Sequence, residues 1–178
     1  GPIKGLHRQE KRLEGLPGLS VLHLRPSYFM ENFLWSIPAI REHGVNGSAL
    51  RGDLRLPMVS TKDIGEKAAD LLDHLDFRGR TLLEFGGPRL LTFHEATAAL
   101  GKAIGKPDLK YVQFPYADAE RTMIGLGIKP SFAGLISEMD RSLNEGRIEP
   151  TQPFSAENRG KTTIEEFARV FARAYTTG

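Results

Sequence analysis

The chain contains no cysteine. This absence excludes a disulfide framework, a thiol nucleophile, Cys-ligated zinc and iron–sulfur clusters, and it fits a reducing compartment, so we expect a cytoplasmic protein. No apolar run approaches the roughly 18 residues that a membrane-spanning helix needs, and no signal-peptide pattern is present, so we expect no membrane partner. Lys plus Arg number 24 and Asp plus Glu number 22. So small an excess gives no field that attracts phosphates, and we expect no nucleic-acid partner.

Several well-known site motifs are also missing. The sequence has no G-x-G-x-x-G, no P-loop, no H-E-x-x-H and no G-x-S-x-G. Gly125-Leu126-Gly127 lacks a third glycine and follows a predicted helix rather than a strand. The five histidines, at positions 7, 23, 43, 74 and 94, have no metal-like spacing, which predicts no metal site. No Tyr is followed four residues later by Lys, so that proton-relay pair is absent.

The composition that is present is typical of a globular domain. The chain has 178 residues, of which 40% are hydrophobic and 26% charged, which is enough for one domain, residues 1–178, with its own core. The first residue is Gly1 and the first methionine is Met30. We therefore expect a processed chain or a piece of a longer protein.

Hydrophobic periodicity and end signals predict alternating strands and helices. Strands are expected at 19–25, 80–85 and 109–114. Helices are expected at 3–15, 28–40, from 60 or 61 onward, at 92–104, 117–125 and 131–145, and from 162 or 163 onward. Residues 41–58 and 147–161 are expected to be loops, the first of them functional or partly hairpin. The pattern predicts an α/β fold with a mostly parallel sheet, which three strands leave incomplete.

The segment from Leu24 to Asn32 is the strongest candidate for a ligand site. A strand ends at Arg25-Pro26 and turns directly into a predicted helix. The carboxyl ends of strands in an open α/β sheet are where ligands bind, and a helix N-terminus adds free N–H groups. Tyr28, Phe29 and Met30 are equally compatible with simple packing into the core. The polar residues that follow them in this otherwise apolar stretch favour a ligand role for the whole segment.

Several motifs in order resemble one family, the NmrA-like, atypical branch of the short-chain dehydrogenase/reductase superfamily. They are a helix with His7 and residues 10–14, then Leu24-Arg25-Pro26, Phe29-Met30-Glu31-Asn32, residues 60–69, Gly87-Pro88, Leu91-Thr92 with Glu95, and residues 100–105. These motifs span nearly the whole chain. The stretch Arg-Pro-x-x-Phe-Met-Glu-Asn is fairly specific, and the later helices carry less information.

The resemblance implies a two-part architecture. An N-terminal Rossmann half with a Gly-rich turn binds NAD or NADP, and the C-terminal half closes over the nicotinamide and forms the substrate pocket. This chain resembles the C-terminal part only: the last strands of a doubly wound parallel sheet and a mostly helical substrate subdomain. The Gly-rich half is absent from it, so cofactor binding is expected to need that half. The nicotinamide-side contacts of the family map onto Pro26, Ser27, Tyr28, Phe29 and Asn32. By position alone, the candidates for the substrate pocket are Met30, Trp35, His43 and Met58.

The chain departs from the family pattern on its first helix. Classical members of the superfamily, and some atypical ones, carry a Lys there. Glu10 stands at the matching position with Lys11 beside it, and Leu6 stands where the classical catalytic Tyr would fall. Tyr transfers the proton, and Lys lowers its pKa and holds the ribose. Members without this pair either reduce substrates with other proton donors or bind NAD(P) without turnover.

Three hypotheses therefore stay open. The complete protein is an NAD(P)H-dependent oxidoreductase with a small-molecule substrate, or it is a non-catalytic NAD(P)-binding redox regulator. As a third reading, the chain is a shortened α/β unit without a cofactor site of its own. Absence of the N-terminal strands would expose a parallel strand edge, which predicts a homodimer or self-association.

Overall fold

The computed structural model describes residues 1–177. Its elements in chain order are α1 (Ile3–Glu14), β1 (Val21–Pro26), η1 (Met30–Ser36), α2 (Ile37–His43), β2 (Val45–Ser48), α3 (Thr61–His74), β3 (Arg80–Phe85), α4 (Phe93–Ala103), β4 (Lys110–Gln113), α5 (Tyr116–Gly125), α6 (Pro130–Asn144), η2 (Ala156–Asn158) and α7 (Ile164–Thr177). The elements η1 and η2 are 3₁₀ helices. The predicted α/β fold class is confirmed.

The strands form two parallel pairs. β1 pairs with β3 from Val21↔Arg80 to Pro26↔Phe85, and β2 pairs with β4 from Val45↔Lys110 to Ser48↔Gln113. Each pair is joined by a helical crossover, as parallel strands require. The other side of β1 has no neighbouring strand among residues 1–177. In the part of the chain that the structure describes, the sheet is therefore open at β1.

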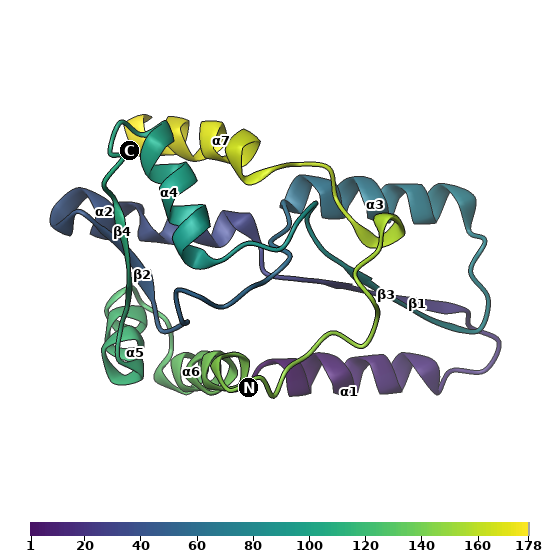
Figure 1. The fold of residues 1–178 in the computed structure, drawn as a ribbon. Helices are drawn as coiled ribbons and strands as arrows, with labels where there is room; N and C mark the ends of the chain where they lie inside the picture. Colours follow the sequence, from purple (N-terminus) through teal and green to yellow (C-terminus); the bar gives the residue numbers. More distant parts are fainter. Residues whose placement is uncertain (178) are drawn as a thin grey trace.

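Helices lie on both sides of the strands. Figure 1 shows α1, α5 and α6 along one side, and α3, α4 and α7 along the other. The core gathers between η1, α2, α4 and α7, and it contains the fully buried Phe93, Leu100 and Phe171. Val170, next to the buried Phe171 on α7, is 44% exposed.

The expected helix 28–40 is wrong in its type and its bounds. Phe29 has extended backbone angles, and a 3₁₀ helix runs from Met30 to Ser36 before α2 begins. Pro38 stands in the first turn of α2, where its missing N–H costs no hydrogen bond. Proline therefore sits at the start of a helix here and does not end one. Gly44, in the left-handed region, ends α2.

The region 41–58, expected to be a loop, contains the strand β2. Its sequence, Val45-Asn46-Gly47-Ser48, has a low intrinsic strand propensity. Pairing with β4 decides the conformation: a Cβ on Gly47 would lie 2.4 Å from the Val112 carbonyl oxygen, so only glycine allows this approach. The Asn46 amide donates to Thr97 Oγ1 at 2.8 Å and is buried.

The helix caps were mostly predictable. Thr92 and Glu95 form the expected capping box, and Ser60 accepts from the Lys62 N–H at the start of α3. The helix α6, expected at 131–145, runs from Pro130 to Asn144, and no side chain caps its start. Within residues 1–177, no helix combines the length and the apolar composition that crossing a membrane requires.

Candidate functional site

The segment Pro26–Met30 is joined to the carboxyl ends of β1 and β3. The Ser27 N–H donates to the Phe85 carbonyl at 2.9 Å, which extends the β1–β3 pairing by one bond. The Val59 N–H donates to the Tyr28 carbonyl, and the Met30 N–H donates to the Val59 carbonyl, both at 2.9 Å. These bonds fix the backbone of the segment at the edge of the sheet where open α/β folds bind ligands.

The turn after β3 contacts residues 57–59, which in turn are hydrogen-bonded to the segment Pro26–Met30. Gly86 and Gly87 are buried, and the Gly87 N–H donates to the Pro57 carbonyl at 2.9 Å. A Cβ on Gly87 would lie 1.8 Å from the Met58 carbonyl oxygen. The Gly-Gly-Pro turn is therefore needed so that residues 57–59 can lie between the turn and the candidate site.

Glu31 has a structural role in the segment. Its carboxylate accepts hydrogen bonds from Ser60 Oγ at 3.1 Å and from the Thr61 N–H at 3.0 Å. A carboxylate at the first turn of α3 is stabilised by the free N–H groups of that turn. Glu31 thus joins η1 to α3 and holds the candidate site together, and its polarity needs no ligand to explain it.

Tyr28 connects the segment to the core. Its ring makes edge contacts with Phe33 and Phe93, with ring centres 5.8 and 5.1 Å apart. Burial raises the pKa of the Tyr28 phenol well above its usual value, and the Asn32 side chain lowers it only in part. The phenol is therefore neutral at physiological pH.

A second tyrosine lies in the same region. Tyr111 of β4 packs against Phe93, with ring centres 5.3 Å apart, and its hydroxyl lies 2.9 Å from the Leu50 carbonyl and 2.7 Å from Ser48 Oγ. Burial raises the pKa of Tyr111 to about 12. The charge of an ionised Tyr111 is also among the causes that raise the pKa of Tyr28.

Asp140 of α6 is the third titratable group near these phenols. It is 9% exposed, and burial raises the pKa of its carboxyl to about 6. Its charge contributes to raising the pKa values of both Tyr28 and Tyr111. Three elements distant in sequence thus bring two phenols and one carboxyl to the same region.

The structure places the predicted site residues in different environments. Of the predicted nicotinamide contacts, Phe29 is 36% exposed, Asn32 is exposed, and Pro26, Ser27 and Tyr28 are partly buried. Their role toward a cofactor stays a prediction.

The four predicted pocket residues differ in their exposure to solvent. Met30 and Met58 have no exposed surface and belong to the core cluster, whereas Trp35 on η1 is 72% exposed. His43 is exposed at the last position of α2. In the described part of the chain, Met30 and Met58 therefore pack as core residues and Trp35 is open to a ligand or a partner.

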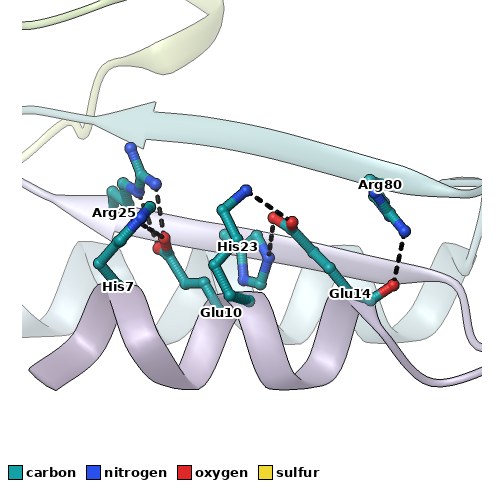
Figure 2. Close-up of polar contacts among 7 residues, drawn as sticks. His7, Glu10, Glu14, His23, Arg25 and Arg80 are labelled. Atoms are coloured by element: carbon teal, nitrogen blue, oxygen red, sulfur yellow. Dashed lines mark hydrogen bonds and ion pairs between the residues drawn. The ribbon is translucent and has the colours of Figure 1, made fainter.

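The helix α1 faces β1 with its acidic side chains (Figure 2). Glu10 accepts two hydrogen bonds from the Arg25 guanidinium, at 2.8 and 2.5 Å, and these bonds lower the pKa of the Glu10 carboxyl. Glu14 Oε1 lies 3.3 Å from His23 Nε2, within ion-pair distance but without hydrogen-bond geometry. Leu6 is 67% exposed. The two positions at which the resemblance led us to look for Tyr and Lys thus hold an exposed leucine and a glutamate bound to Arg25.

Sequence reasoning missed Tyr111 and Asp140. A pattern for Asp140 was present: Ala133, Ser137 and Asp140 follow helical spacing and all three are buried, so the acid lies on the inner face of α6. A carboxyl group on the buried face of a helix is rare enough to mark a candidate site. Tyr111 had no such local pattern, because a tyrosine in a short strand is ordinary.

Curated relatives match most of the chain, whereas no family model matches it. The chain is 28% identical over 142 residues to prestalk A differentiation protein A of Dictyostelium discoideum, which aligns 78% of this chain with 45% of that protein. It is 28% identical over 161 residues to the NAD(P)H azoreductase of Xenophilus azovorans, which aligns 89% of this chain with 55% of the azoreductase. The chain therefore spans about half the length of these relatives.

Solved structures give the fold. The NADPH-dependent quinone oxidoreductase QOR2 of Escherichia coli superposes with a TM-score of 0.77 at 24% identity, over 94% of this chain and 60% of that chain. NmrA, a negative transcriptional regulator in complex with NAD, superposes with a TM-score of 0.66 at 17% identity, over 94% of this chain and 57% of that chain. The chain has a Rossmann-type α/β fold. It is the fold of the NmrA-like, atypical short-chain dehydrogenases/reductases, as the sequence motifs indicate.

Proposed function

We propose that this chain is the C-terminal part, on the nicotinamide and substrate side, of an NAD(P)H-dependent oxidoreductase. One observation carries the proposal: residues 26–30 are fixed by hydrogen bonds to Phe85 and Val59 at the carboxyl ends of β1 and β3. Ligands of open α/β sheets bind at this edge. The similarity to an NAD(P)H azoreductase and to a quinone oxidoreductase supports the same reading.

The residues at this edge fit one end of a dinucleotide. The half-exposed ring of Phe29 offers an apolar surface to the nicotinamide, and the partly buried Ser27 and the exposed Asn32 offer hydrogen-bonding groups. No Gly-rich turn occurs in the sequence, so the pyrophosphate must be held by residues outside this chain. When bound, the reduced cofactor supplies a hydride. The chain's own residues orient the ring and restrict its access to water.

The test uses the protein as its gene encodes it. Oxidation of NADPH and of NADH is followed by the loss of dinucleotide absorbance with a quinone, an azo dye and a small carbonyl compound as acceptors. Turnover with at least one acceptor is expected. A protein that binds NAD(P)H and oxidises it with none of the three would contradict the oxidoreductase proposal.

A second candidate function is a non-catalytic NAD(P)-binding regulator. It is favoured by the contacts of Glu10, which is bound to Arg25 and does not replace the missing Lys, and by the exposed Leu6. This candidate predicts different affinities for the oxidised and the reduced cofactor without turnover. Equal affinities for the two would argue against a redox sensor.

We also propose that the open side of β1 is covered in the working protein. Its unpaired backbone groups would otherwise be a template for another strand. Size-exclusion chromatography with light scattering of the 178-residue chain should show a dimer or larger species. A clean monomer would contradict this proposal and would favour the third reading, an independent α/β unit without a cofactor site.

A further inference from the structure

Segment 150–160, between α6 and α7, runs along β3 on the side away from β1 (Figure 1). Toward β1, the Val21 N–H donates to the Gly79 carbonyl and the Ser27 N–H donates to the Phe85 carbonyl. Backbone groups of successive strand residues point to alternate sides, so the odd-numbered residues of this stretch face β1. The even-numbered ones face away from β1 and form what we call the outer edge: Leu82, Glu84 and, directly after the strand, Gly86.

A side-chain amide takes the place of a neighbouring strand at the outer edge. Gln152 Nε2 donates to the Leu82 carbonyl at 2.8 Å, and Gln152 Oε1 accepts from the Glu84 N–H at 2.7 Å. A primary amide offers donors and an acceptor side by side, much as a strand does to its neighbour. Gln152 therefore occupies two backbone groups that a further strand would otherwise bind.

Backbone bonds close the far end of the outer edge. The Gly86 N–H donates to the Asn158 carbonyl at 2.9 Å, and the Gly160 N–H donates to the Gly86 carbonyl at 2.7 Å. Gly86 and Arg159 thus form an isolated parallel bridge. Both backbone groups of Gly86 are occupied, so segment 150–160 covers the outer edge from Leu82 to the turn after β3.

The Glu84 side chain binds the same segment. Its carboxylate accepts hydrogen bonds from the Thr151 N–H at 2.8 Å, from Thr151 Oγ1 at 2.9 Å and from the Gln152 N–H at 2.9 Å. Hydrogen bonds to an ionised acceptor are stronger than neutral ones. Glu84 therefore fixes the backbone of residues 151 and 152 at the place where the Gln152 amide reaches the outer edge.

The segment itself presents a poor edge for a further strand. Pro150 and Pro153 flank the bound dipeptide and have no backbone N–H to donate. The buried Asn158 side chain donates to the Pro153 carbonyl at 3.0 Å and accepts from the Ser155 N–H at 2.9 Å. These bonds fold the segment into a compact turn, so it ends the sheet and does not extend it.

We propose that segment 150–160 blocks the outer edge of β3 from pairing with the same edge of a second copy of this chain. A strand edge is self-complementary in antiparallel orientation, and a two-fold axis brings two identical edges together. The residues Thr81-Leu82-Leu83-Glu84-Phe85 are mostly apolar and strand-forming, which makes such an edge prone to association when it is uncovered. This inference goes beyond the proposed function and does not depend on it.

The test compares Gln152→Ala, Gln152→Glu and a control, Gln9→Ala, in the full-length protein. Gln152→Ala removes both bonds to the outer edge. Gln152→Glu keeps the shape of the side chain but places a carboxylate oxygen against the Leu82 carbonyl, so two acceptors face each other. Gln9 is exposed on α1, and its substitution should change neither of the readouts below.

Amide hydrogen exchange reports whether the outer edge is covered. In the wild type, the Glu84 and Gly86 N–H groups should be protected, although no strand lies beside them among residues 1–177. In Gln152→Ala the Glu84 N–H should exchange about tenfold faster, while the Phe85 N–H on the β1 side should keep its rate. Unprotected Glu84 and Gly86 N–H groups in the wild type would overturn the proposal without any variant.

Light scattering after size exclusion reports whether the cover prevents association. Both Gln152 variants should gain a species of twice the wild-type mass as concentration rises, and dilution should reverse it. Unchanged amide protection within α4 shows that the variants are folded, because α4 belongs to the core.

The opposite results are equally clear. Folded Gln152 variants that expose the Glu84 N–H and keep the wild-type mass at every concentration would overturn the blocking role. Unchanged Glu84 exchange in Gln152→Ala would overturn the role of the amide. Neither readout involves a dinucleotide or an acceptor, so a failure here leaves the oxidoreductase proposal intact, and a failure of that proposal leaves this one intact.

Discussion

The Glu10 carboxylate on α1 accepts two hydrogen bonds from the guanidinium of Arg25, at 2.8 and 2.5 Å. Arg25 lies in β1 directly before Pro26, the last residue of the strand. Such paired bonds between guanidinium and carboxylate fix orientation as well as distance. They hold the strand end that leads into the candidate site against α1, as Figure 2 shows. Glu10 therefore serves to position the end of β1 that leads into Pro26.

Glu10→Gln should destabilise the protein in a pH-dependent way. Arg25 lowers the pKa of Glu10, so the stabilisation is complete above the unfolded-state pKa and is lost as pH falls through the folded-state value. Urea unfolding near pH 7 should show a loss of about 1 kcal/mol, which shrinks near pH 3. Glu66→Gln on the exposed side of α3 is the control and should change stability little. A loss that is the same at both pH values would contradict an ion-pair role.

Gly87→Ala should be strongly destabilising. Its new methyl group would lie 1.8 Å from the Met58 carbonyl oxygen, so either the Gly-Gly-Pro turn or residues 57–59 must move. We expect a loss of about 3 kcal/mol in the free energy of unfolding. The matched control is Gly65→Ala in α3, where a Cβ meets nothing within 4 Å and helix propensity predicts a gain of about 1 kcal/mol. Thermal unfolding of the pair measures both effects, and equal stabilities of the two variants would contradict the close approach.

Local patterns predicted those parts of the fold that local interactions determine. The sequence predicts the capping box of Thr92 and Glu95 and the buried face of α4, because both depend on residues within a few positions of each other. The strand β2 could not be predicted from the sequence, because only its pairing with β4 makes Gly47 and its neighbours extended. The 3₁₀ turn at Met30 was missed for a similar reason: the Met30 N–H is bonded to Val59, a distant residue.

The candidate site likewise has one part that could be predicted from the sequence and one part that could not. The edge formed by Pro26 and its neighbours could be located from sequence, because a strand that ends at Arg-Pro marks the carboxyl end of a parallel strand. The grouping of Tyr28, Tyr111 and Asp140 could not, since it depends on how β4 and α6 pack. Met30 and Met58 are buried in the core cluster, a placement that proximity in sequence to a site does not reveal, and their role in a substrate pocket stays a prediction.

Phe29→Ala should weaken cofactor binding without unfolding the protein. The ring is 36% exposed, so its removal leaves little cavity in the core. If the ring covers the nicotinamide, the Kd of the full-length protein for NADPH should rise about tenfold, the value expected for the loss of a partly buried apolar contact. Isothermal titration calorimetry measures this Kd. Leu90→Ala, which removes another exposed apolar side chain, at 42% exposure, is the control and should not change the Kd. Equal affinities of wild type and Phe29→Ala would remove Phe29 from the binding site.

Asp140 should make the protein less stable as pH rises. The folded-state pKa of about 6 lies above the ordinary value of 3.8, so the folded chain binds more protons than the unfolded chain between these values. Stability from this group is therefore complete below about pH 3.8 and declines as pH rises to about 6. The cost at neutral pH should be about 3 kcal/mol, and Asp140→Asn, which cannot ionise, should avoid it. Other acids with lowered pKa values, such as Glu10 and Glu95, act in the opposite direction at lower pH, so the informative quantity is the difference in stability between variant and wild type.

Urea unfolding between about pH 4 and pH 8 should show that Asp140→Asn becomes more stable relative to the wild type as pH rises, while Asp73→Asn, a control at an exposed position of α3, follows the wild type. Parallel curves for Asp140→Asn and wild type would mean that the carboxyl is already hydrated or paired in the folded protein and that its pKa is not raised.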